Sequence, residues 1–230
     1  MDIVYTLKPD PRSRNRQLIY SLRSVEKYLR GYGRVFVIGI DSGLKNITHV
    51  PANDFESPAI NIKNKLMIAC NEPDISDNFL YMADDYYFLK EQSIEEHPTY
   101  SSGLLFDLAR IQKNAYKQYV LHTAQALNGG INFNVHAPIV YNKEKLIAAV
   151  NKFDWSVDGL GYLVKSLYGN TNNVPSVPLA DLKIRRDIPV EEMKAKLVDR
   201  PVFSTGKEWE SKNISRLLAE LYPDKSKFEA

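Results

Sequence analysis

The sequence is poor in the residues and runs that mark secreted, membrane-spanning and zinc-binding proteins. It holds 1 cysteine in 230 residues, which excludes an internal disulfide and a cysteine-rich zinc site. No stretch reaches the ~18 apolar residues of a membrane span, and the first residues resemble a strand and not a signal peptide. A net charge of only +2 argues against binding long duplex DNA by charge alone.

What the chain does contain is typical of a soluble globular protein. Hydrophobic residues make up 44% and charged residues 25% of it, and the length suits one large domain. Cys70 lies in an apolar run, so we expect a buried structural thiol. A lone cysteine fits a reducing compartment, and the sequence therefore predicts a cytoplasmic protein.

The first 40 residues alternate between strand and helix patterns. Residues 2–7 and 34–40 are short apolar runs rich in β-branched residues, and residues 16–30 place apolar side chains at helical spacing. This order predicts an α/β fold with a mostly parallel sheet flanked by helices. Further helices are expected at 61–72, 104–127, 143–152, 160–168, 189–199 and 209–222.

Two adjacent acids follow an apolar run that is typical of a buried strand. Residues 79–82 form a buried-strand run that stops at Asp84 and Asp85, and a second aromatic run covers 86–89. Ligands bind at the carboxyl ends of strands in such sheets, and adjacent acids repel each other unless a cation lies beside them. The pair therefore indicates a Mg²⁺ or Mn²⁺ site completed by substrate phosphates. The alternative is a solvated turn between two hairpin strands.

Basic residues follow the first strand and open the helix expected at 61–72. Lys8, Arg12 and Arg16 lie in or beside a loop that suits phosphate binding. Lys63 and Lys65 are expected in the first turn of this helix, where a positive charge is unfavourable unless an anion lies nearby. We therefore expect Lys63 or Lys65 to meet a diphosphate. The alternatives are a solvated basic loop and a surface lysine.

Residues 131–141 alternate between apolar and polar side chains, as in a half-buried strand. Asn132, Asn134 and His136 fall on one face of that strand, which predicts a polar lining. A lone strand histidine is commonly a structural group, so that alternative stays open for His136.

Two further segments are candidates for the site. Residues 91–103 have the pattern of a loop over it. Asp158 is at or near the first turn of the helix expected at 160–168, where a carboxylate acts as a helix cap or as a general base for an acceptor hydroxyl.

Four segments, 2–6, 18–28, 75–88 and 134–146, contain recognisable motifs, among them the paired aspartates and the His-x-Pro step of residues 136–138. Together they resemble the conserved regions of the Stealth family of sugar-phosphate transferases, whose second region has paired aspartates and whose third has a His-x-Pro step. The resemblance covers scattered blocks of about the first 150 residues.

The resemblance implies a fold similar to the nucleotide-diphospho-sugar transferase (GT-A) fold. It implies a single domain over 1–230, with a nucleotide-sugar core at 1–150 and an acceptor side and closing segment at 151–230. The donor would be a nucleotide sugar and the cofactor Mn²⁺ or Mg²⁺. From the residue patterns above, the predicted roles are catalytic for Asp85, His136 and Asp158, donor-binding for Lys8, Arg12, Arg16, Lys65 and Asp84, and metal-binding for Asp84, Asp85 and His136.

The function predicted on this basis is metal-dependent transfer of a sugar to an acceptor hydroxyl. The acceptor is a polysaccharide or a modified DNA base, since small enzymes of this kind in phages act on hydroxymethylated bases. One alternative is transfer of a hexose 1-phosphate, as the Stealth resemblance implies. Another is a non-catalytic module that binds a nucleotide sugar or a polymer. The sequence leaves the sugar, the nucleotide and the oligomeric state open.

Overall fold

The computed structural model describes residues 1–9, 15–55, 57–156 and 159–229. Its centre is a five-stranded sheet with the order β4-β3-β1-β5-β9, in which β9 runs antiparallel to β5 and the other neighbours are parallel. The strands are β1 (Asp2–Leu7), β3 (Val35–Gly39), β4 (Thr48–Pro51), β5 (Asn78–Met82) and β9 (Ile139–Asn142). The predicted α/β fold with a mostly parallel sheet is confirmed.

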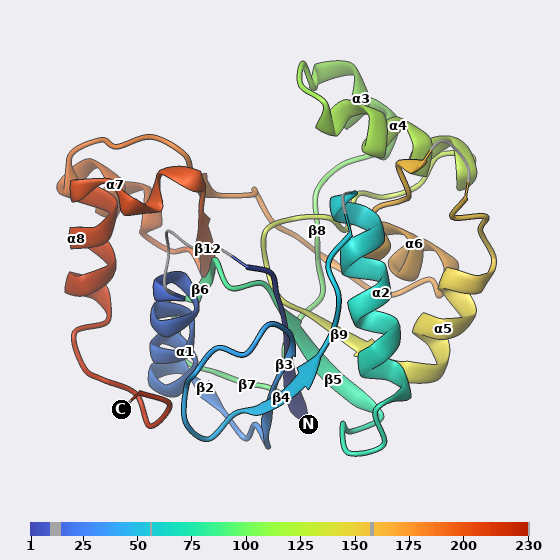
Figure 1. The fold of residues 1–230 in the computed structure, drawn as a ribbon. Helices are drawn as coiled ribbons and strands as arrows, with labels where there is room; N and C mark the ends of the chain where they lie inside the picture. The colour runs from blue at the N-terminus through green and yellow to red at the C-terminus, as the bar shows by residue number, and fades with distance from the viewer. Residues whose placement is uncertain (10–14, 56, 157–158, 230) are drawn as a thin grey trace.

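Helices cover both faces of this sheet (Figure 1). On one face lies α1 (Arg16–Tyr28), and on the other lie α2 (Pro58–Asn71), α5 (Lys143–Asn151) and α6 (Val164–Thr171). Successive side chains of a strand point to opposite faces, so Tyr5 packs in the core between the sheet and α1, and Val4 packs in the core between the sheet and α2. Burial on both faces explains why the strands read as nearly continuous apolar runs.

Helix α2 begins three residues before the predicted start at 61. Ser57 caps it, its hydroxyl accepting a backbone N–H of the first turn, and a proline follows at the first helical position. Lys63 and Lys65 therefore lie beyond the first turn, so the prediction that placed these lysines in the first turn was wrong. Cys70, near the end of this helix, is buried as predicted, and burial raises its pKa to about 12.

A second, three-stranded sheet joins the C-terminal segment to the middle of the chain. Its order is β11-β12-β6, where β6 (Tyr86–Phe88) follows β5 after three residues. Tyr87, Phe203 and Trp209 lie in the core of this part. Its other elements are β11 (Lys183–Ile184), α7 (Val190–Leu197), β12 (Val202–Thr205), the 3₁₀ turn η2 (Lys207–Glu210) and α8 (Lys212–Leu221).

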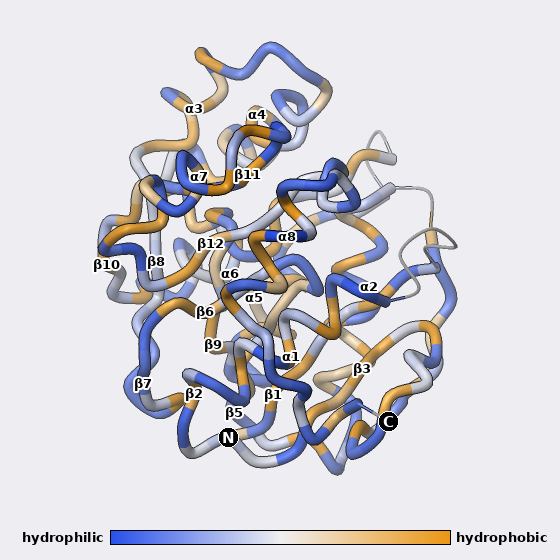
Figure 2. The backbone as a smooth tube through the Cα atoms, turned by 90° about the vertical axis from the view of Figure 1, so that its left-hand side faces the viewer, coloured by the Kyte–Doolittle hydropathy of each residue, from blue (hydrophilic) through white to orange (hydrophobic). Residues whose placement is uncertain are grey.

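Helices α3 (Leu105–Ile111) and α4 (Tyr116–Ala126) form a hairpin at the edge of the molecule (Figure 1). The hairpin has a small core of its own, and Figure 2 shows hydrophobic colour on α3 at the top of the molecule. Two hydrogen bonds attach α4 to the segment before α6: the Leu163 N–H donates to Thr123 Oγ1 at 2.9 Å, and His122 Nδ1 lies 3.0 Å from the Gly161 carbonyl oxygen.

The predicted strand at 131–141 was wrong for most of its length. Only β9, at its end, is a strand, and residues 132–137 run as an irregular segment. The Asn132 side chain accepts the backbone N–H of Asn134, and such local bonds compete with a sheet ladder. The alternation predicts burial only in part: Phe133 and Val135 are both 2% exposed as expected, whereas Ile131 is 40% exposed and Asn132 is 4% exposed.

The segment 91–103 was also misplaced by the prediction. It holds two short strands, β7 (Gln92–Ser93) and β8 (Tyr100–Ser101), which pair with β2 (Leu29–Arg30) and β10 (Val177–Pro178). None of its residues lines either cavity described below. The helix expected at 160–168 begins at Val164 and continues to Thr171. Across the described ranges, no helix has the length and apolar character needed to cross a bilayer.

Candidate active site

Asp84 and Asp85 lie where the chain passes from the central sheet to the second sheet. Both side chains are half-buried and line a cavity of about 600 Å³, the first cavity. Asp85 also lines a second cavity of about 330 Å³. Tyr81 and Lys183 are among the residues common to both walls, so the two cavities meet at the acid pair. This is the carboxyl end of a central strand, where sheets of this class bind ligands.

The electrostatics of the pair favour a nearby cation. Burial and the neighbouring Asp85 raise the pKa of Asp84 to about 7, and nearby lysines offset only part of this rise. On the other side, Lys183 Nζ donates to Asp85 Oδ2 at 2.7 Å. A second positive charge beside Asp84 would favour its ionised form.

The acid pair has the donor chemistry of a site for a hard divalent cation. Mg²⁺ and Mn²⁺ prefer carboxylate and phosphate oxygens, and one or two carboxylates with substrate phosphates suffice to hold them. Among the residues that the structure describes, no three His, Cys, Asp or Glu side chains cluster closely enough to hold a metal. His136 is therefore not brought together with the two aspartates as a ligand set. The residues present fit a two-carboxylate anchor.

The basic residues predicted to bind the donor do not all line the first cavity. Lys8 lines the first cavity. Arg16 is exposed and lines neither cavity. Arg12 and the candidate base Asp158 lie outside the described residues.

Lys65 is 1% exposed and lies in the wall of the first cavity. Its Nζ donates to the Leu7 carbonyl oxygen and to Asp54 Oδ1, both at 2.6 Å. Asn61 Nδ2 donates to the same Asp54 oxygen at 3.1 Å. The Lys65 ammonium thus ties the end of β1 to the segment after β4, and this anchoring is the role that the observed contacts support.

Tyrosines wall the second cavity. A tyrosine offers an apolar ring face and a polar edge, which suits the faces of sugar rings and of bases. Asn134 Nδ2 donates to Tyr116 Oη at 2.8 Å, which links the irregular segment to the α3–α4 hairpin. The tyrosines are Tyr81, Tyr86, Tyr116, Tyr119, Tyr141 and Tyr162.

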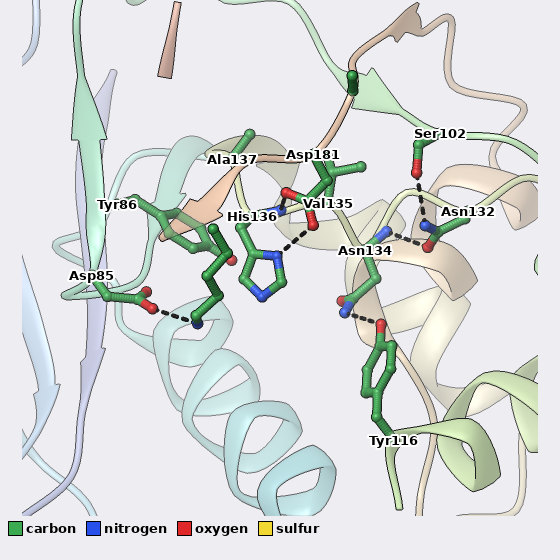
Figure 3. A network of polar contacts seen from close by, with 12 residues as sticks. Asp85, Tyr86, Ser102, Tyr116, Asn132, Asn134, Val135, His136, Ala137 and Asp181 are labelled. Carbon is green, nitrogen blue, oxygen red and sulfur yellow. Dashed lines mark hydrogen bonds and ion pairs between the residues drawn. The ribbon is translucent and has the colours of Figure 1, made fainter. Parts of the chain in front are cut away.

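His136 lines the second cavity, and its side chain is hydrogen-bonded to Asp181 (Figure 3). Asp181 holds it twice, because Oδ2 lies 2.6 Å from His136 Nδ1 and Oδ1 accepts the His136 backbone N–H at 2.9 Å. Burial alone would raise the pKa of Asp181, but its hydrogen bonds from His136 lower it below the usual value. An imidazole that donates from Nδ1 has Nε2 as its acceptor, which is the arrangement of a general base.

Sequence reasoning missed Asp181, Lys183 and Lys165. Asp181 is 45 residues from His136, in a segment with little regular structure, and no local pattern indicates that they meet. Lys165 carried a signal, because it interrupts the apolar run before Tyr168 and lies on a helix face that is buried. A lysine in such a position is rarely left without a polar partner.

Comparisons with known proteins point to one fold. No protein-family model matches the chain, and no curated protein matches it in sequence. A crystal structure of the galactosyltransferase LgtC, in complex with donor and acceptor sugar analogs, matches with a TM-score of 0.57 and 15% identity over 98% of this chain and 96% of that one. This chain has the fold of LgtC. A structure of an active-site mutant of LgtC matches with a TM-score of 0.52 and 14% identity, over the same shares of both chains.

The likeness confirms the fold predicted from the sequence, a GT-A-like α/β architecture with a mostly parallel sheet. At this level of identity it speaks for the fold and leaves the chemistry to be argued from the site. Membership of the Stealth family is not supported by any of the comparisons.

Proposed function

We propose that the protein transfers a sugar from a nucleotide-sugar donor to an acceptor hydroxyl. The observation that carries this proposal is the acid pair at the meeting point of two cavities, at the carboxyl end of β5. Two adjoining cavities suit a reaction between two substrates. The fold supports it, since LgtC is a galactosyltransferase crystallised with donor and acceptor sugar analogs.

The first cavity is the proposed donor site. Asp84 and Asp85 would hold Mn²⁺ or Mg²⁺, which neutralises charge on the diphosphate leaving group when bound. Lys8 faces the same cavity and adds a positive charge for phosphate. The volume of this cavity, about 600 Å³, is the larger of the two and is in the range of sites that bind ligands of the size of a nucleoside diphosphate.

The second cavity is the proposed acceptor site. His136, oriented by Asp181, takes the proton of the acceptor hydroxyl at Nε2. The hydroxyl oxygen forms a bond to the anomeric carbon of the sugar, and the bond from that carbon to the diphosphate breaks with its electron pair leaving on the diphosphate. The geometry thus favours His136 as the base, in a role that the sequence assigned to Asp158.

The acceptor is a polysaccharide or a modified DNA base in this proposal, because tyrosine faces accept either a sugar ring or a base. A binding panel tests the donor part. Nucleotide sugars are added with and without Mn²⁺, and the thermal midpoint is followed, since a ligand of the folded state raises it. We expect at least one nucleotide sugar to raise the midpoint in the presence of Mn²⁺. A panel in which no nucleotide sugar shifts it would contradict the proposal.

Product analysis then separates sugar transfer from transfer of a hexose 1-phosphate. Sugar transfer releases the nucleoside diphosphate, and hexose 1-phosphate transfer releases the monophosphate. We expect the diphosphate. A non-catalytic binding module would give neither product while still binding its ligand, and Asp85→Asn would then leave the affinity unchanged.

A further inference from the structure

The buried ammonium of Lys165 contacts both the segment around His136 and the tyrosine next to the acid pair. The residue is on α6, is 4% exposed and borders the second cavity. Its Nζ donates to Tyr86 Oη at 3.2 Å and to the carbonyl oxygens of Val135 and Ala137 at 3.0 and 2.5 Å. A lysine ammonium has three donors, so these three acceptors account for all of them and a ligand would find none left.

The three acceptors of the Lys165 ammonium belong to two different parts of the candidate site. Val135 and Ala137 flank His136 on both sides, and Tyr86 directly follows Asp85. The segment 132–137 has no sheet ladder to hold it in place. The ammonium therefore fastens the backbone around His136 to the strand that begins at the acid pair.

We propose that Lys165 is a positioning residue that sets the place of His136 relative to Asp85. The proposal rests on the function proposed above, in which these two residues serve the acceptor and the donor. Asp181 is hydrogen-bonded to the imidazole, and Lys165 to the carbonyl oxygens of the two flanking residues. Together the two residues hold both the imidazole of His136 and the backbone that carries it.

The cost of keeping a charge there supports a specific role. Burial lowers the pKa of Lys165 to about 7, against the opposing effect of Asp181 and Asp85. The ring of Tyr86 lies 4.7 Å from Nζ and provides a further favourable contact. An apolar side chain of similar length would avoid the desolvation cost but would leave the Val135 and Ala137 carbonyls without this donor, so we expect Lys165→Met to lose some stability as well.

A purely structural lysine must be distinguished from a positioning one. Lys143 supplies the matched control, because it is half-buried and its Nζ also donates to two backbone carbonyls, those of Glu72 and Ile75. It lines neither cavity. Loss of its ammonium tests what the loss of such contacts does to the protein away from the site.

The experiment compares Lys165→Met with Lys143→Met in donor binding and in sugar transfer. Because Lys165 does not line the first cavity, we expect the donor Kd of Lys165→Met to stay within about twofold of wild type, while kcat falls about 100-fold from misplacement of His136. We expect Lys143→Met to keep both values. A wild-type kcat in Lys165→Met, or an equal loss in both variants, would overturn the proposal.

A double-mutant cycle tests whether Lys165 acts through His136. If it does, His136→Ala lowers kcat strongly in the wild type and little further in Lys165→Met, because coupled residues are not additive. Multiplying effects would contradict the proposal. Should Lys165→Met not fold, Tyr86→Phe removes one of the three acceptors from a folded chain, and we expect the same pattern with a loss of about tenfold. Absence of nucleotide-sugar binding by the wild type would instead count against the proposed function itself.

Discussion

His97 gives the clearest prediction for the stability of this fold. It is 7% exposed, its Nδ1 lies 2.9 Å from Gln92 Oε1, and its ring packs edge-on against Phe88 and Tyr100. Burial lowers its pKa from 6.5 to about 4, and a hydrogen bond to the Pro138 carbonyl opposes this only in part. The folded protein thus keeps this imidazole neutral over a pH range in which the unfolded chain protonates it.

The sign and size of the effect follow from linkage. The stabilisation is fully present above the unfolded pKa of 6.5 and is lost as the pH falls toward the folded value of about 4. The two values give a loss of about 2 kcal/mol at about pH 5 and about 3 kcal/mol at about pH 4. Against the ~5–15 kcal/mol that keeps a typical domain folded, this is a large share.

The assay is urea unfolding of wild type and His97→Gln at about pH 7.5 and about pH 5, followed by fluorescence of the two tryptophans. Glutamine does not titrate, so we expect the stability of the variant to fall by about 2 kcal/mol less than that of wild type over this interval. Phe79→Leu, in the core between the sheet and α2, is the control for a general loss of stability. We expect its stability to keep the wild-type pH dependence. An equal pH dependence in wild type and His97→Gln would refute the reasoning.

Two further predictions concern packing around the site. Lys65→Met removes the ammonium that holds Leu7 and Asp54. We expect the free energy of unfolding in urea to fall by about 2–3 kcal/mol, a value already reduced because the Asp54 side chain is 31% exposed. A loss below about 0.5 kcal/mol would show that this anchor is unimportant for stability. Gly169→Ala places a methyl group 2.5 Å from the Phe133 ring, and we expect a lower thermal midpoint and a loss of about 1–3 kcal/mol; an unchanged midpoint would mean that the irregular segment yields easily.

The sequence allowed the central sheet to be predicted because its strands are buried on both faces. Runs such as residues 35–39 have no polar residue to confuse their period, and the helix at 16–28 has a clear apolar stripe. Segment 131–141 failed for the opposite reason. Its alternation is that of a strand, but its backbone is satisfied by side chains of Asn132, Ser166 and Lys165, two of which come from a helix far along the chain.

The candidate site was predictable where it is local in sequence and not where it is assembled by tertiary contacts. Asp84 and Asp85 follow the end of β5, so the apolar pattern of that strand is enough to predict where they lie. The partners of Asp85 and His136 are Lys183 and Asp181, which come from a segment with few apolar residues and two short strands. Only the folded chain shows that Asp85, Lys183 and His136 line adjoining cavities and that Asp181 is hydrogen-bonded to His136.

The measurement that tests the central claim most directly is calorimetric titration of a nucleotide sugar into wild type and Asp85→Asn, each with and without Mn²⁺. Asp107→Asn, which neutralises an exposed acid on α3, is the control. We expect Mn²⁺ to strengthen donor binding by at least about tenfold in wild type and in the control, and to have little effect in Asp85→Asn. Donor affinity that is the same with and without Mn²⁺ in wild type, or an undiminished effect of Mn²⁺ in Asp85→Asn, would contradict the assignment of the acid pair.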